Sequence, residues 1–235
     1  MRLAVISDLH LGRRDVVDSF GHEDDSFVRF LRFLEGSFER IVLLGDIFET
    51  LTARVPQQQR AELRAAREAH PEIVRRFERS QYLYVHGNHD LVAGPTLGAP
   101  EELAIEADGV RLLFTHGHRH DWIIRHVRQL SEWGVWAGGW IRRFGLHGFF
   151  RACDLLDQRL RGASVDAAHC TFQRWAMHLG HERKADVVVT GHTHLGSLAH
   201  HGPRLFLNSG TCSEGKFSFL AIDTKRGDYA LHDSW

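Results

Sequence analysis

The sequence predicts an α/β fold, and three observations support this prediction. First, the chain holds short apolar runs of the kind found in strands that are buried on both faces. These runs lie at residues 3–6, 41–44, 82–85 and 186–190. Second, the stretches between the first three runs have helical patterns. Third, each run ends in glycine or polar residues, and open α/β sheets place their ligands at the carboxyl ends of strands.

Helices are predicted where apolar residues recur at helical spacing. Residues 19–38 contain such a stripe, which is most simply explained by core packing. Residues 57–79 predict one or two exposed, arginine-rich helices that Pro71 interrupts. A loop rich in glycine and proline is expected over residues 93–100.

The second half of the chain predicts further strands. Residues 102–106 and 110–114 form a hairpin around Asp108-Gly109, a sequence typical of a tight turn. Residues 204–207, 217–223 and 228–231 are expected to complete a run of antiparallel strands.

Residues 121–183 show no strand pattern, so we expect three or four helices inserted into a single domain that spans residues 1–235. Five of the six tryptophans lie in this insertion, among clustered arginines and glycines. An apolar cover with a basic rim suits a substrate that has acyl chains and phosphates. A helical layer packed on the sheet would use the same aromatic residues, and the sequence favours neither reading.

The composition excludes several functional classes. The formal net charge of −1 argues against a broad nucleic-acid surface, so nucleic acid is not an expected partner. Three cysteines without C-x-x-C spacing predict neither a disulfide framework nor a zinc–thiolate site. We expect no signal peptide, and no apolar run reaches the length of about 18 residues that a membrane span needs. A cytoplasmic location is expected, with peripheral contact at the inner membrane face if the insertion binds lipid.

Side chains with metal-ligand chemistry follow five of the predicted strands. These are Asp8, His10, Asp46, Asn88, His116, His192 and His194. Alternate residues of a strand share a face. We therefore expect Asp8 and His10 to point together into one cleft, and His192 and His194 to do the same. Carboxylate, amide and imidazole ligands suit Mn, Fe or Zn better than magnesium, and Mn is the first expectation. Because the Asp46 carboxylate could be shared, the set suffices for two divalent ions.

Neighbouring residues are candidates for catalysis. His89 can exchange a proton near neutral pH, so it would protonate the leaving oxygen or hold a phosphate oxygen beside Asp46. Asn88, His118 and Arg119 are candidate substrate contacts, although a solvated histidine is the simpler reading of His118.

Two further segments allow more than one role. Glu49 could equally be a partner of a site residue or a charge at the start of a helix. Residues 208–211 form a polar turn that could face the cleft.

Five motifs occur in one order between residues 8 and 194: D-x-H, G-D, G-N-H-D, a histidine after a strand, and G-H-T-H. In this the chain resembles the calcineurin-like metallophosphoesterase superfamily. The resemblance implies a four-layer α-β-β-α sandwich and hydrolysis at a pair of metal ions. It implies that one ion is held by Asp8, His10, Asp46 and His194, and the other by Asp46, Asn88, His116 and His192.

Within that superfamily the chain resembles the UDP-2,3-diacylglucosamine pyrophosphohydrolase group of lipid A biosynthesis. The matching segments are residues 7–11, 45–49 and 208–211, together with the helical insertion. That group usually has arginine where this chain has His89, and aspartate where it has His118. The resemblance implies a nucleotide-linked lipid as the phosphoester substrate.

Three alternatives compete with this reading. The first is a phosphodiesterase or phosphatase of a soluble substrate, with the insertion as a structural cap. A repair nuclease shares the core motifs, but needs a basic groove that a near-neutral chain does not favour. A non-enzymatic scaffold is disfavoured because every ligand position is filled.

Overall fold

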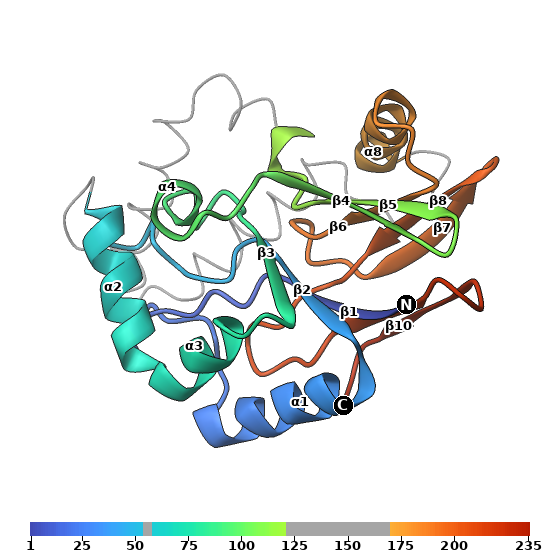
Figure 1. Cartoon of the computed structure of the whole chain (residues 1–235). Coiled ribbons are helices and arrows are strands. Elements are labelled where there is room, and N and C mark those ends of the chain that lie inside the picture. The colour runs from blue at the N-terminus through green and yellow to red at the C-terminus, as the bar shows by residue number, and fades with distance from the viewer. Residues whose placement is uncertain (54–57, 121–169) are drawn as a thin grey trace.

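The computed structural model describes residues 1–53, 58–120 and 170–235, which form two five-stranded sheets with helices outside them (Figure 1). The first sheet has the strand order β10-β9-β1-β2-β3. Its strands are β1 (Arg2–Ile6), β2 (Arg40–Leu44), β3 (Tyr82–Val85), β9 (Phe219–Asp223) and β10 (Asp228–His232). The second sheet has the order β4-β5-β6-β8-β7. Its strands are β4 (Glu102–Ala107), β5 (Val110–Thr115), β6 (Val187–Thr190), β7 (Ser197–His201) and β8 (Arg204–Asn208).

Five α-helices and one short 3-10 helix accompany the sheets in the described part of the chain. They are α1 (Asp24–Ser37), α2 (Gln59–Ala69), α3 (Pro71–Phe77), α4 (Ala93–Leu97), η1 (His118–His120) and α8 (Thr171–Glu182). None of these described helices has the length and apolar character that crossing a bilayer requires.

Both sheets are mixed. In the first, β1 and β3 run parallel to β2, whereas β9 runs antiparallel to β1 and β10. In the second, β5 and β8 run parallel to β6, whereas the edge strands β4 and β7 run antiparallel to their neighbours. The carboxyl ends of the parallel strands therefore gather at one edge of each sheet.

The cores show that the sheets and helices form four layers. Ile6 of β1 packs in the core between the first sheet and α1, whereas its neighbour Val5 packs between the two sheets. Val188 of β6 packs on the other side of the second sheet, against residues of α8. The order is thus helix, sheet, sheet, helix, and the four-layer architecture implied by the resemblance is confirmed.

Several local predictions are also confirmed. The four apolar runs are β1, β2, β3 and β6, and the first helix lies within the predicted range. Helices α2 and α3 meet at Pro71, which occupies the first turn of α3, where its missing N–H costs nothing. Asp108 and Gly109 both have positive φ, as a two-residue hairpin turn requires. Of the predicted insertion, α8 is helical, and residues 121–169 lie outside the described residues.

Two local predictions are wrong, and one strand was missed. The loop at 93–100 contains α4, which accommodates Pro95 in its first turn and ends at Gly98 in the left-handed region. The last strands are not one antiparallel run, because β8 pairs in parallel with β6, while β9 and β10 form a hairpin in the other sheet. Strand β7 was not predicted, because it is a half-exposed edge strand whose sequence ends in two histidines.

Candidate metal centre

The seven predicted ligands meet where the two sheets present their carboxyl ends. Residues 8 and 10 follow β1, residue 46 follows β2 and residue 88 follows β3, whereas residue 116 follows β5 and residues 192 and 194 follow β6. Six of the seven side chains are buried, and His194 is partly exposed. Segments more than a hundred residues apart thus bring carboxylate, amide and imidazole groups to one place.

The backbone at these positions differs from the prediction. Strands β1 and β6 end at Ile6 and Thr190, so strand alternation does not orient the paired ligands. Instead, five ligands adopt positive φ between 51° and 70°, a conformation that non-glycine residues rarely adopt. These are Asp8, His10, Asp46, His192 and His194. Such backbone strain persists where the surrounding structure enforces it and is typical of functional sites.

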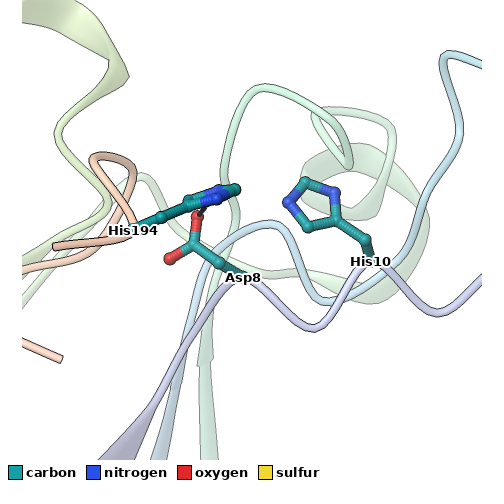
Figure 2. A group of neighbouring side chains, drawn as sticks. All are labelled: Asp8, His10 and His194. Atoms are coloured by element: carbon teal, nitrogen blue, oxygen red, sulfur yellow. Dashed lines mark ion pairs between the residues drawn. The ribbon is translucent and has the colours of Figure 1, made fainter. Parts of the chain in front are cut away.

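The first ligand group consists of Asp8, His10 and His194, whose donor atoms lie within 4.8 Å of one another. Figure 2 shows the ring of His194 against the Asp8 carboxylate, with the ring of His10 to one side of this pair. Oδ1 of Asp8 lies 3.2 Å from Nε2 of His194. Oδ2 of Asp8 accepts hydrogen bonds from the Ser7 hydroxyl and from the backbone N–H of His192 (3.1 Å). One carboxylate oxygen is therefore held by the protein, while the other faces the histidines.

The second group consists of Asp46, His116 and His192. Nδ1 of His116 donates to the carbonyl of Leu44 (2.9 Å), which fixes the ring and turns Nε2 toward Oδ2 of Asp46 at 3.1 Å. The same Nε2 lies 3.9 Å from Oδ1 of Asp8, so the two groups adjoin. These two groups divide the ligands as expected of two neighbouring ions; a third group of donor atoms within the same distance joins His10 to Glu49 and His89.

Unsatisfied atoms test whether these residues fit metal ions. Within the described residues, four buried ligand atoms have no partner in hydrogen-bond geometry: Asp8 Oδ1, His10 Nε2, Asn88 Oδ1 and His116 Nε2. Buried polar atoms are nearly always satisfied, so four orphans in one cluster require an explanation. Each is an oxygen or imidazole nitrogen of the kind that coordinates Mn, Fe or Zn. The residues fit divalent metal ions.

The electrostatics of the cluster agree with a cation site. Burial alone would lower the pKa of His116, but Asp46 and Asp8 outweigh it and raise that pKa to about 10. Burial would raise the pKa of Asp46, but His116, His89 and His10 hold it well below its usual range. The site therefore keeps the carboxylates of Asp46 and Asp8 ionised, as metal ligands must be.

Glu49 lies beside this cluster and pairs with His89. Its Oε2 is 2.8 Å from Nδ1 of His89 and 3.4 Å from Nδ1 of His10, and the rings of the two histidines are 4.7 Å apart. Burial lowers the pKa of His89, but Glu49 and Asp46 raise it to about 9. Turns follow Glu49 in the described chain, so the helix-start alternative is wrong. Glu49 is a partner of two site residues.

Asp90, the last residue of the G-N-H-D motif, supports the site through hydrogen bonds that only the folded chain reveals. Its Oδ2 accepts hydrogen bonds from the N–H of Ile47 (2.8 Å) and the hydroxyl of Tyr84 (2.5 Å), and its Oδ1 accepts from the N–H of Gly87 (2.6 Å). This fully buried carboxylate thus joins the turn that carries Asp46 to the turn that carries Asn88.

The polar turn at residues 208–211 is buried against the ligand loops. Asn208 donates to the carbonyl of Gly191 (2.7 Å), Ser209 contacts Ser7 (2.7 Å between hydroxyl oxygens), and Thr211 donates to the carbonyl of Asp8 (3.0 Å). The turn therefore supports two ligand loops from beneath.

The remaining candidate substrate contacts lie at the edge of the cluster. His118 is buried beside His116, with ring centroids 5.8 Å apart, and burial together with His116 lowers its pKa to about 3. Arg119 is exposed and forms an ion pair with Glu101. Whether either residue contacts substrate stays a prediction.

The chain resembles known proteins in both sequence and structure. Residues 1–135, more than half of the chain, match the model of the calcineurin-like phosphoesterase superfamily domain. None of the curated proteins matches the chain. Vps29 of Chaetomium thermophilum has a similar fold, with a TM-score of 0.50 and 14% identity over 99% of this chain and 92% of that one.

Two other solved structures are similar at lower scores. One is a conserved uncharacterized protein of Streptococcus pneumoniae TIGR4, a predicted phosphoesterase, with a TM-score of 0.42 and 18% identity over 99% of this chain and 97% of that one. The other is an archaeal phosphodiesterase, with a TM-score of 0.43 and 14% identity over 99% of both chains. The family match and the cluster of ligands lead to one conclusion. The chain belongs to the calcineurin-like phosphoesterase superfamily and is a metal-dependent phosphohydrolase.

Proposed function

We propose that the protein hydrolyses a phosphoester or pyrophosphate bond with the help of two divalent ions held by the seven clustered ligands. The observation that carries this proposal is the set of four buried, unsatisfied ligand atoms, which belong to both halves of the cluster. A pair of ions bound there would lower the pKa of a water molecule and neutralise charge on the phosphoryl group. Manganese is the proposed metal, because the mixed ligand set accepts it readily.

His89 is the proposed proton donor to the leaving oxygen. Its Nδ1 is engaged by Glu49 at 2.8 Å, which leaves Nε2 as the ring nitrogen that can transfer a proton. A pKa raised to about 9 keeps the ring protonated at neutral pH, as an acid catalyst must be. Asp46 would be the ligand shared by the two ions, because it belongs to the second ligand group and its carboxylate also interacts electrostatically with His10 of the first.

The proposed substrate is a nucleotide-linked lipid such as UDP-2,3-diacylglucosamine. The support comes from the sequence: residues 7–11, 45–49 and 208–211 resemble that pyrophosphohydrolase group, and residues 121–183 combine tryptophans with arginines. In this proposal the insertion covers the acyl chains and meets the membrane surface peripherally.

Turnover on two substrates tests the proposal. We would compare UDP-2,3-diacylglucosamine with bis(p-nitrophenyl) phosphate at matched concentrations in the presence of Mn²⁺. A strong preference for the lipid nucleotide supports the proposed substrate. Hydrolysis of the small diester alone would contradict the lipid assignment and favour a soluble phosphodiester, while the metal chemistry would stand.

Variants in the insertion sharpen this comparison. Trp136 and Trp140 lie outside the described residues, so their role is argued from the sequence alone. Replacing both with alanine should raise the KM for the acylated substrate more than the KM for the small diester. Equal effects on both substrates would indicate that these side chains only pack.

A further inference from the structure

A cavity of about 750 Å³ lies beside the segment that carries Asn88 and His89. One wall is the start of α2, and the other is formed by residues on either side of Gly87-Asn88-His89-Asp90. Its lining includes Gln59, Arg60, Ala61, His86, Leu91 and Val92. The volume falls within the range of sites that hold small molecules.

The cavity is close to the metal centre along the chain. His86 precedes Asn88 by two residues, which places their Cα atoms within about 7 Å of each other. Leu91 and Val92 follow Asp90, the carboxylate that fixes the neighbouring turns. If a phosphate of the substrate lies at the metal ligands, a group attached to that phosphate can therefore reach the cavity through a short linkage.

The lining has the chemistry of a nucleotide site. Leu91 and Val92 offer an apolar surface to a planar base, and the amide of Gln59 can pair with polar atoms at the edge of a base. Arg60 brings positive charge, and none of the described lining residues is acidic. Within the described chain, no carboxylate forms an ion pair with Arg60, so its guanidinium is available to a phosphate or ribose oxygen.

One wall is tied to the loop that carries His10, and the other is tied to the segment before β4. Arg13 follows His10 by three residues, and its Nε lies 3.1 Å from Oε1 of the buried Glu62 on α2. On the other side, the backbone N–H of His86 donates to the carbonyl of Pro100 (3.0 Å). These contacts hold the cavity in a fixed position relative to the ligands, as a preformed subsite requires.

We propose that this cavity is the subsite for the nucleotide half of the substrate, with Arg60 facing its phosphate or ribose oxygens and Leu91 and Val92 beneath the base. The proposal rests on the proposed function, because it assigns one half of that substrate to a place in the described structure. The acyl half of the substrate then lies outside this cavity.

Uridine 5′-monophosphate is the probe, and its binding to the Mn²⁺-loaded protein is measured by calorimetry. Arg60→Gln should weaken binding about tenfold, the loss of one charged hydrogen bond. Ala61→Trp should fill the cavity and abolish binding. Arg64→Gln is the matched control, since Arg64 is an exposed arginine one turn further along α2 that does not line the cavity.

Turnover supplies a second readout. In Arg60→Gln, the ratio of kcat/KM for UDP-2,3-diacylglucosamine to that for bis(p-nitrophenyl) phosphate should fall about tenfold. Arg64→Gln should leave this ratio unchanged.

The two readouts separate failure of the subsite from failure of the proposed function. Unchanged nucleotide affinity in Ala61→Trp would overturn the subsite, even if the lipid nucleotide is hydrolysed. Dodecyl phosphate serves as a probe for the lipid half. If Ala61→Trp abolishes binding of dodecyl phosphate and leaves nucleotide binding intact, the subsite proposal is also overturned, because the cavity would then hold an alkyl chain. Nucleotide binding that depends on Ala61, without turnover of the lipid nucleotide, would support the subsite and refute only the lipid substrate.

Discussion

The backbone N–H of His89 donates a hydrogen bond of 2.8 Å to Oδ1 of Asp46. This bond ties the proposed acid to the proposed bridging ligand and leaves Oδ2 of Asp46 toward His116. The two turns can come this close only because Gly87 stands between them: a Cβ at Gly87 would lie 2.1 Å from Oδ1 of Asp46. The site thus depends on a residue with no side chain.

Gly87→Ala should therefore abolish hydrolysis of bis(p-nitrophenyl) phosphate, because the added methyl displaces the Asp46 carboxylate. The matched control is Gly36→Ala in α1, where a Cβ meets nothing within 4 Å. That control should keep full activity and gain about 0.5–1 kcal/mol of unfolding free energy from the better helix former. Wild-type activity in Gly87→Ala would contradict the packing described here.

Asp90 should be a stability residue as well as a support for the site. Asp90→Ala leaves buried N–H groups of Gly87 and Ile47 without an acceptor, so the free energy of unfolding should fall by about 2–4 kcal/mol. Tyr84→Phe removes one donor to Asp90 and should cost about 1 kcal/mol. Urea unfolding measures both, with the exposed Asp228→Ala as the control. A loss below about 0.5 kcal/mol in Asp90→Ala, the size of an ordinary surface substitution, would contradict this role.

Glu49 should act through His89. Its carboxylate raises the pKa of that ring, so Glu49→Gln should lower it. If protonated His89 donates to the leaving oxygen, activity falls as pH rises through this pKa, and the fall should begin at lower pH in the variant. The pH dependence of kcat measures the shift. An unchanged basic limb together with a reduced kcat would mean that Glu49 only holds the loop in place.

The leaving group provides a control for the role of His89. His89→Ala should slow hydrolysis of esters with poor leaving groups more than hydrolysis of nitrophenyl esters, whose leaving oxygen needs little protonation. Equal losses for both classes of ester would refute proton donation and favour a role in holding a phosphate oxygen.

Metal affinity should rise with pH. The neighbouring carboxylates raise the pKa of His116 to about 10, so near neutral pH its Nε2 carries a proton that an incoming ion must displace. Titration of Mn²⁺ into chelator-treated protein, in buffers of different ionisation enthalpy, should show about one proton released for this ligand. Affinity that falls between pH 6 and pH 8 would contradict the assignment of His116 as a ligand.

The sequence predicted the strands and the ligand-bearing turns because both are local features. An apolar run followed by Gly45-Asp46 or Gly191-His192 marks a buried strand and the turn at its end. The backbone of those turns could not be predicted, because positive φ at Asp8 or His192 is enforced by distant contacts such as the bond from His192 to Asp8.

The roles of the supporting residues could not be predicted for a related reason. Asp90 lies in the G-N-H-D motif and Asn208 in the polar turn at 208–211, but their roles depend on partners that only the folded chain brings near. Glu49 had two readings until the structure placed His89 beside it.

The metal content and activity of Asp46→Asn compared with wild type test the two-ion account most directly. Chelator-treated wild-type protein should take up two Mn²⁺ ions per chain and then hydrolyse bis(p-nitrophenyl) phosphate, as the two adjoining ligand groups predict. Asp46→Asn should take up fewer ions and lose activity by about a thousandfold or more, since it removes the shared carboxylate. Wild-type turnover without metal, or full activity in Asp46→Asn, would contradict the account.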